Sequence, residues 1–225
     1  MGAQWPRLAS QLSPSKTSSP PLGSPVKRSG GLLGAPGCPV PLERVESKRY
    51  RLLHPRPVYV IVAAHGGRVN AMAASWVSPL SEEPERITVA FEKESYTYEL
   101  VRASGEFTVN VVPASMLEAV WCLGTRSGRG RDKLAECGAA VEPSRSVEAP
   151  RLQGAIGVIE ARVYKVYEDV AEDVDLVVAD IVDAYADPSL FNPRYGWQVT
   201  KAEILFHASG RAFTTPGRLL LAGKR

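Results

Sequence analysis

Short runs of β-branched and aromatic residues recur along most of the chain, and they constrain its fold more than any other feature. Such runs predict strands, whereas the apolar spacing of helices occurs only in brief stretches. Six or so strands with short helices argue against a doubly wound α/β fold and favour an antiparallel barrel or sandwich with helices at its ends. The predicted strands are residues 58–64, 69–77, 86–91, 106–112, 155–170 and 174–186, with a further one near 202–207. The predicted helices are residues 97–104, 113–124 and 132–137.

The first 42 residues differ in composition from the rest of the chain. They contain 8 Pro, 6 Gly and 7 Ser, and no acidic residue is among them. Such a segment buries too little apolar surface to offset the entropy lost on ordering it. We therefore expect residues 1–42 to be a disordered N-terminal extension, or a stretch upstream of a misplaced start codon. The folded domain is expected to occupy residues 43–225.

Charge is distributed unevenly. Residues 1–50 carry seven Lys or Arg and two Glu, which leaves 20 basic and 22 acidic residues in the remaining 175. The basic surplus therefore belongs to the first segment and not to the domain, so we expect no nucleic-acid partner. The apolar runs are far shorter than the roughly 20 residues that a membrane-spanning helix needs. We accordingly expect no membrane association.

The three cysteines, Cys38, Cys122 and Cys137, form no CxxC pair, and the three histidines are scattered without HxH or HxxxH spacing. These spacings predict neither a zinc site nor another metal site. The odd number of cysteines also argues against a disulfide framework. Free thiols suit a reducing compartment, which predicts a cytoplasmic location.

The stretch SGRGRDK, residues 127–133, is the densest basic cluster in the chain. It lacks the third glycine of the dinucleotide-binding fingerprint and follows a helix instead of a strand, so it predicts no Rossmann site. Its glycines and arginines precede a short helix, which suits a phosphate group; a solvated basic loop is the alternative. The chain has no P-loop and no recognisable nucleophile signature, so we assign no catalytic residue.

Three stretches, taken in order, resemble one family. They are NAMAASWVSPLSEEP at residues 70–84, ITVAFEKESYTYELVRASGEFTVNVV at 87–112 and GTRSGRGRDK at 124–133. Their order and separation are similar to those of the flavin reductase-like family, which has the FMN-binding split-barrel fold. The resemblance covers residues 50–213. It implies a mainly β protein with short helices, built as an antiparallel six-stranded split β-barrel.

The resemblance also implies which residues contact the cofactor. Side chains as small as Ala73 would let a flat isoalloxazine reach the backbone of the strand, with Trp76 closing the pocket. A plain core strand packed against a bulky neighbour is the alternative. The implied cofactor-binding residues are Asn70, Ala71, Met72, Ala73, Ala74, Ser75, Trp76, Ser95, Thr97, Asn110, Ser127, Gly128, Arg129, Asp132, Lys133 and His207, with Phe213 as an aromatic neighbour of the last.

The function implied by the resemblance is that of an oxidoreductase that binds FMN or FAD. It would pass hydride or electrons from NADH or NADPH to a free flavin, a ferric complex or a partner protein. A homodimer is implied as well, and the strands within residues 155–184 suit its contact surface because both of their faces carry apolar residues. Two other functions stay open. One is a flavoprotein electron carrier without pyridine-nucleotide activity, and the other is a related barrel that binds haem or only stores flavin.

Overall fold

The computed structural model describes residues 42–222. The chain divides into two units, of which one includes Arg7–Leu52 and the other the sheet-forming part that follows. In the first unit the described residues, 42–52, are exposed, and the 3-10 helix η1 (Arg49–Leu53) begins there. Disorder was expected for residues 1–42. Apart from Leu42, these residues lie outside the part of the chain that the structure describes. Among residues 42–222 no helix is long and apolar enough to cross a membrane.

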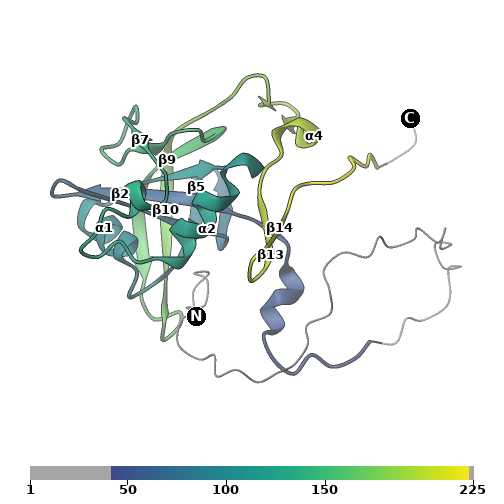
Figure 1. The fold of residues 1–225 in the computed structure, drawn as a ribbon, viewed down its shortest axis with the longest axis horizontal. Helices are drawn as coiled ribbons and strands as arrows, with labels where there is room; N and C mark the ends of the chain where they lie inside the picture. Colours follow the sequence, from purple (N-terminus) through teal and green to yellow (C-terminus); the bar gives the residue numbers. More distant parts are fainter. Residues whose placement is uncertain (1–41, 223–225) are drawn as a thin grey trace, which may run out of the picture. The chain divides into compact units, whose positions relative to one another are not determined.

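The second unit is built on a seven-stranded antiparallel sheet with the order β3-β2-β6-β9-β10-β5-β4. Its strands β2, β5, β9 and β10 can be found in Figure 1. Its strands are β2 (Tyr59–His65), β3 (Arg68–Ala74), β4 (Val77–Glu82), β5 (Glu85–Glu92), β6 (Glu106–Val111), β9 (Gly157–Tyr167) and β10 (Val174–Ala186). The expectation of a mainly β protein with short helices is confirmed. Seven strands occur where six were expected because the strand predicted at 69–77 is interrupted after Ala74 and the chain continues as β4.

The interruption of this strand brings the two ends of the sheet near each other. The end strands β3 and β4 are separated along the chain by Ser75 and Trp76 alone. Three residue steps span at most about 11 Å, so the two ends of the sheet must approach each other. The carbonyl of Trp76 accepts a hydrogen bond of 3.0 Å from the N–H of Ala90 on β5, which fixes the crossing. Ser75 and Trp76 connect the two end strands covalently, but β3 and β4 are not paired by backbone hydrogen bonds.

Two helices cover opposite faces of the β2–β3 hairpin. Helix α1 (Tyr96–Ser104) packs its buried Tyr98 and Val101 against the face that carries Met72 and Ala74. Helix α2 (Leu117–Thr125), which follows the 3-10 turn η2 (Ala114–Met116), packs against the other face. Side chains alternate between the faces of a strand, so each helix contacts every second residue of β3. Helix α1 ends at Gly105, whose φ of 74° is a left-handed conformation that glycine adopts without a steric penalty.

The interior of the barrel is aromatic. Phe91 of β5 stacks on Tyr98 of α1 with ring centroids 5.1 Å apart, and it meets Phe107 of β6 edge-on at 6.1 Å. All three side chains are buried. The hydroxyl of Tyr98 donates a hydrogen bond of 2.6 Å to the buried carboxylate of Asp175 on β10. Helix α1 is thereby fixed to the barrel by both apolar packing and a buried polar contact.

Several very short strands complete the unit. The sequence did not predict most of them, because a strand of two or three residues has no measurable period. They are β1 (Arg56–Pro57) with β13 (Phe206–Ser209) and β14 (Ala212–Thr214), β7 (Val141–Glu142) with β8 (Arg151–Leu152), and β11 (Phe191–Asn192) with β12 (Gly196–Trp197). Two single-turn helices, α3 (Lys133–Glu136) and α4 (Val199–Ala202), also occur.

The cysteine prediction is wrong for two of the three residues. Cys122 of α2 and Cys137, the residue that follows α3, form a disulfide. The two lie 15 residues apart in sequence, and they come together because the chain between α2 and α3 folds back and brings Cys137 beside Cys122. Spacing alone gave no sign of this closure. The argument for a reducing compartment therefore no longer rests on these thiols.

Candidate functional site

The small side chains of β3 make room for helices. Ala71 and Ala73 belong to the cluster formed with α2, whereas Met72 and Ala74 belong to the barrel interior with α1. All four are at most 3% exposed, so neither face of this strand is open to a flat ring within one chain. At its outer edge β3 pairs with no further strand within residues 42–222, since it ends the sheet. The backbone of these four residues is covered as well, so a cofactor would reach this edge only if the covering segments moved.

The three sequence motifs meet at one buried amide. The Nδ2 of Asn70 on β3 donates a hydrogen bond of 2.9 Å to Oγ1 of Thr97 in the first turn of α1. Gly128 of the loop lies against the other side of this amide, where an added Cβ would come within 2.0 Å of the Asn70 Oδ1. Only glycine allows this approach of the loop backbone. The amide of Asn70 therefore links strand, helix and loop.

The start of α1 leaves its backbone N–H groups without a side-chain cap. Ser95 is the N-cap residue, but its hydroxyl makes no capping hydrogen bond and instead contacts the sulfur of Met72 at 3.4 Å. The first N–H groups of any α-helix lack an acceptor within the helix. Together with the positive end of the helix dipole, they suit an anion such as a phosphate.

Arg129 brings a positive charge to this helix end. Its guanidinium lies 2.6 Å from the carboxylate of Glu99 in the first turn of α1 and over the ring of Tyr96 at 5.2 Å. Both members of the ion pair are about half exposed, so the pair is in contact with solvent. Arg129 could exchange the Glu99 carboxylate for a ligand phosphate at little cost in free energy, because surface ion pairs are weak.

The remaining residues of the loop hold its shape. The hydroxyl of Ser127 accepts a hydrogen bond from the N–H of Arg129 at 3.3 Å. Asp132 caps α3 by accepting the N–H of Ala135 at 3.0 Å. Lys133 is buried, and its ammonium donates a hydrogen bond of 2.7 Å to the carbonyl of Ala71. Burial lowers the pKa of Lys133 to about 8.

Two predicted contact residues lie apart from this cluster. Asn110 of β6 is fully buried, and its amide bonds the carbonyl of Val60 at 2.9 Å and the N–H of Leu152 at 2.8 Å. His207 lies on β13, in the small sheet β1-β13-β14, where its ring contacts His54 and Phe213 at centroid distances of 5.4 Å each. For both residues, contact with a cofactor stays a prediction.

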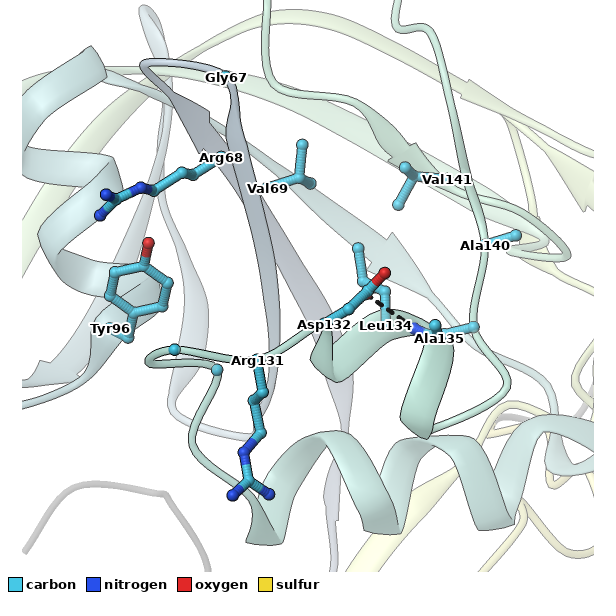
Figure 2. A pocket seen from close by; sticks show the side chains of 13 residues that line it. Gly67, Arg68, Val69, Tyr96, Arg131, Asp132, Leu134, Ala135, Ala140 and Val141 are labelled. Atoms are coloured by element: carbon cyan, nitrogen blue, oxygen red, sulfur yellow. Dashed lines mark hydrogen bonds between the residues drawn. The ribbon is translucent and has the colours of Figure 1, made fainter.

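Two residues beside the cluster were not predicted as site residues. Arg68 begins β3, and Tyr96 begins α1; both line a pocket of about 720 Å³ together with Gly128 and Asp132 (Figure 2). Tyr96 stands between Ser95 and Thr97 in the sequence, so its position within the motif could have identified it as a site residue. Arg68 precedes Asn70 by two residues on the same strand, so its closeness to the motif was also readable from the sequence.

The residues present fit a flavin mononucleotide. The free edge of β3 offers backbone groups to the polar edge of the ring, and the uncapped start of α1 with Arg129 offers donors to a phosphate. Gly128 lets the loop backbone close over the junction. The chemistry of this donor set matches a ligand that is flat and polar at one end and anionic at the other.

Comparison with known proteins identifies the family. Residues 50–212 match the flavin reductase like domain. Over 115 residues the chain is 39% identical to an uncharacterized protein of Pyrococcus abyssi, a match that covers 51% of this chain and 66%, just under two thirds, of that protein. A solved FMN-binding domain of a flavin reductases-like enzyme from Shewanella baltica OS155 is 26% identical with a TM-score of 0.68, covering 77% and 93% of the two chains.

The fold is also found in a flavoredoxin. The structure of flavoredoxin from Desulfovibrio vulgaris (Miyazaki F) is 24% identical with a TM-score of 0.67, and the match covers 75% of this chain and 91% of that one. At this identity the likeness shows the fold alone. With the family match spanning most of the chain, the expected FMN-binding split-barrel fold is confirmed. The chain belongs to the flavin reductase-like domain family.

Proposed function

We propose that this chain is a flavin-dependent oxidoreductase that binds FMN along the edge of β3, at the start of α1 and under the loop of residues 127–133. The observation that carries the proposal is the contact of Asn70 with both Thr97 and Gly128. It joins the three motifs at one point, although they are far apart in sequence. Membership of the flavin reductase-like family supports the choice of ligand.

The backbone near Ala73 is assigned to the polar edge of the flavin ring. In an antiparallel pair, residues bonded to the partner strand alternate with residues whose N–H and C=O point away from it. The carbonyl of Ala71 points away from β2, since the ammonium of Lys133 binds it. Ala73, two residues further on, directs its backbone groups the same way. Hydrogen bonds from such groups set the redox properties of a flavin.

The phosphate is assigned to the first turn of α1. The backbone N–H groups of this turn, the hydroxyls of Ser95 and Thr97, and the guanidinium of Arg129 surround one helix end. Lys133 is not part of this set, because its ammonium is buried against the strand. Arg129 is therefore the cation of the loop that we assign to the phosphate.

Bound FMN would supply the chemistry of accepting hydride from NADH or NADPH and releasing electrons to an acceptor. The contribution of the chain is to hold the flavin fixed at one edge and to leave the opposite side accessible to the nicotinamide. Alignment of this kind accounts for much of the rate in hydride transfer, and no protein general base is needed. The acceptor is a free flavin, a ferric complex or a partner protein.

The unit is proposed to act as a homodimer. The second half of β9 is exposed to solvent, with Tyr164 at 55% and Tyr167 at 42%. Large aromatic side chains are enriched in subunit contacts. Sedimentation of the purified protein gives the oligomeric state, and Tyr164→Glu is expected to shift it to the monomer. A parent protein that sediments as a monomer would contradict this part of the proposal.

The test of the flavin assignment is the visible spectrum of the purified protein, followed by addition of NADH or NADPH without air. Flavin bands that bleach on addition are the expected result. A protein that takes up neither FMN nor riboflavin would contradict the proposal. A Soret band would show that the barrel binds haem instead.

A second function is an electron carrier without pyridine-nucleotide activity. The fold shared with flavoredoxin from Desulfovibrio vulgaris and the lack of a dinucleotide fingerprint in the sequence favour it. The same flavin site would serve both functions. Flavin bands that NADH and NADPH leave unchanged, but that dithionite bleaches, would support the carrier.

A further inference from the structure

A second pocket, with a volume of about 700 Å³, lies beside α1. It is formed by α1, the turn that follows β5, the turn between β9 and β10, and the start of β10. None of the residues that line it is assigned to the flavin. Sites for small molecules have volumes of about 300–1,000 Å³, so the pocket is large enough to hold a ligand of its own.

The pocket contains a buried carboxylate whose hydrogen bonds are incomplete. Asp175, the second residue of β10, lines the pocket although its side chain is 2% exposed. Its Oδ2 accepts a hydrogen bond of 2.6 Å from the hydroxyl of Tyr98, whereas its Oδ1 accepts none from any residue in the range 42–222. Buried polar atoms are nearly always hydrogen-bonded, because leaving one unpaired is costly. Oδ1 therefore marks a place for a donor supplied by a ligand.

Two basic side chains line the pocket, and both contact other acceptors more closely. The ammonium of Lys93 lies 3.4 Å from Oδ1 of Asp175, but its hydrogen bonds go to the carbonyls of Glu168 and Ala171, at 3.0 Å each. The guanidinium of Arg102 lies 3.9 Å from Oδ2 of Asp175 and 2.7 Å from the carboxylate of Glu168. The two cations offset the buried negative charge of Asp175, and they leave the hydrogen bond to Oδ1 unfilled.

The lining as a whole is acidic, with four carboxylates against two cations. Glu99 is paired with Arg129 outside the pocket, and Glu168 is paired with Arg102. Asp169 is exposed, and it forms no ion pair or side-chain hydrogen bond with another residue in the range 42–222. The excess of carboxylates favours a positively charged donor over a neutral one.

The chemistry of the lining suits an organic cation better than a metal ion. Within residues 42–222 no three His, Cys, Asp or Glu side chains are placed to share a metal. Ca²⁺ and Mg²⁺ require several oxygen ligands at once, whereas an ammonium group needs only acceptors for its three N–H groups. The exposed Ala103 and the carbon stems of Lys93 and Arg102 offer apolar contact to a short carbon chain.

We propose that this pocket binds a small aliphatic amine. Its ammonium group donates a hydrogen bond to Oδ1 of Asp175, and its positive charge is shared with Asp169. The carbon chain lies along Ala103. The proposal does not rest on the proposed flavin function, because the two sites have no assigned residue in common.

Two variants and one control test the proposal. Asp175→Asn removes the charge but keeps the size of the side chain and an acceptor for the hydroxyl of Tyr98. Ala103→Arg fills the pocket with a positive charge from an exposed helix position, where Arg is a good helix former. Glu118→Gln is the control, since it neutralises an exposed carboxylate on α2 that does not line the pocket.

The probe is putrescine, titrated by calorimetry into the 225-residue chain with and without FMN. Tetramethylammonium, which is charged but has no N–H group, and Mg²⁺ are the comparison cations. The parent is expected to bind putrescine saturably and at least about tenfold more tightly than either comparison cation. Asp175→Asn and Ala103→Arg should raise the Kd for putrescine at least about tenfold, and Glu118→Gln should change it less than about twofold.

Three results overturn the proposal. Absence of saturable putrescine binding would show that water alone meets Oδ1 of Asp175. Equal affinities for the three cations would show attraction by charge without a site. A parent-like Kd in folded Ala103→Arg would place the amine elsewhere, and this variant decides the question if circular dichroism shows that Asp175→Asn does not fold. A protein that binds FMN but not putrescine contradicts this proposal and not the proposed function, and the reverse result contradicts only the proposed function.

Discussion

The ammonium of Lys133 lies 2.7 Å from the carbonyl oxygen of Ala71, and the lysine is 5% exposed. This hydrogen bond attaches the first residue of α3 to the free edge of β3. The loop of residues 127–133 is therefore held at its end by a buried contact to the strand that it covers. A buried positive charge with a single carbonyl partner is costly, and this cost is visible in the lowered pKa of the lysine.

The buried lysine predicts a pH dependence of stability. Its pKa is about 8 in the folded protein against an ordinary 10.5, so the unfolded chain binds more protons between these values. The contribution of Lys133 to the free energy of unfolding should therefore rise with pH in this window, by about 2 kcal/mol from pH 8 to pH 10. Lys133→Met removes the titrating group, so urea unfolding of this variant should lack the rise. Equal slopes in parent and variant would show that Lys133 is not buried in solution.

The sequence predicted most of the fold because its signals are local. The apolar runs predicted β2, β5, β6, β9 and β10, and helix α1 was predicted at residues 97–104 against Tyr96–Ser104 observed. The family resemblance implied that the three motifs share one cofactor site; the structure brings Asn70 into contact with Thr97 and Gly128, while their contact with a cofactor stays a prediction. The predicted strands depend on the strand period, which is readable without coordinates.

The remaining features depend on packing between distant segments. The strand at residues 69–77 was expected to continue to Val77, but it breaks at Ser75, where the chain passes from one end strand of the sheet to the other. The alanines of β3 were assigned to a ring on their face, whereas their side chains face helices α1 and α2. The ammonium of Lys133 binds the carbonyl of Ala71, a contact that the sequence did not indicate, and the predicted contact of Lys133 with a cofactor stays a prediction. None of these contacts has a signature in residue spacing.

Gly128→Ala tests the junction of the three motifs. The added Cβ would lie 2.0 Å from the Oδ1 of Asn70, so the loop or the amide must move and the Asn70–Thr97 hydrogen bond is disturbed. We expect the Kd for FMN to rise at least tenfold while circular dichroism stays unchanged, because overpacking at one loop residue costs about 1–3 kcal/mol. Gly217→Ala is the matched control, since its added Cβ meets no atom within 4 Å. Parent-like FMN affinity in Gly128→Ala would place the flavin elsewhere.

The disulfide predicts that oxidation of the two cysteines stabilises the loop of residues 127–133. Cys122 and Cys137 bracket residues 123–136, which include the whole SGRGRDK stretch. Closing a loop of this length stabilises a protein by about 3 kcal/mol. We expect the double variant Cys122→Ala, Cys137→Ala to melt at a lower temperature and to release FMN faster than the oxidised parent. A thiol count on the unfolded parent should give one free cysteine, and a count of three would contradict the disulfide.

Arg129→Ala tests whether Arg129 contributes to binding of the flavin phosphate and not of the flavin ring. FMN carries a phosphate that the nearly neutral domain must offset locally, and Arg129 lies at the start of α1 beside Glu99 and Tyr96. Loss of a charge-assisted hydrogen bond of roughly 1.5–3 kcal/mol should weaken FMN by about one to two decades. Riboflavin lacks the phosphate, so its affinity should change by less than about threefold, a difference that fluorescence quenching resolves.

Arg131→Ala is the comparison within the same loop, because the guanidinium of Arg131 contacts Glu136 on α3 and not α1. Equal weakening of FMN and riboflavin would show that Arg129 shapes the loop without contacting the phosphate, and unchanged affinities would show that its guanidinium contacts Glu99 and Tyr96 but not the flavin.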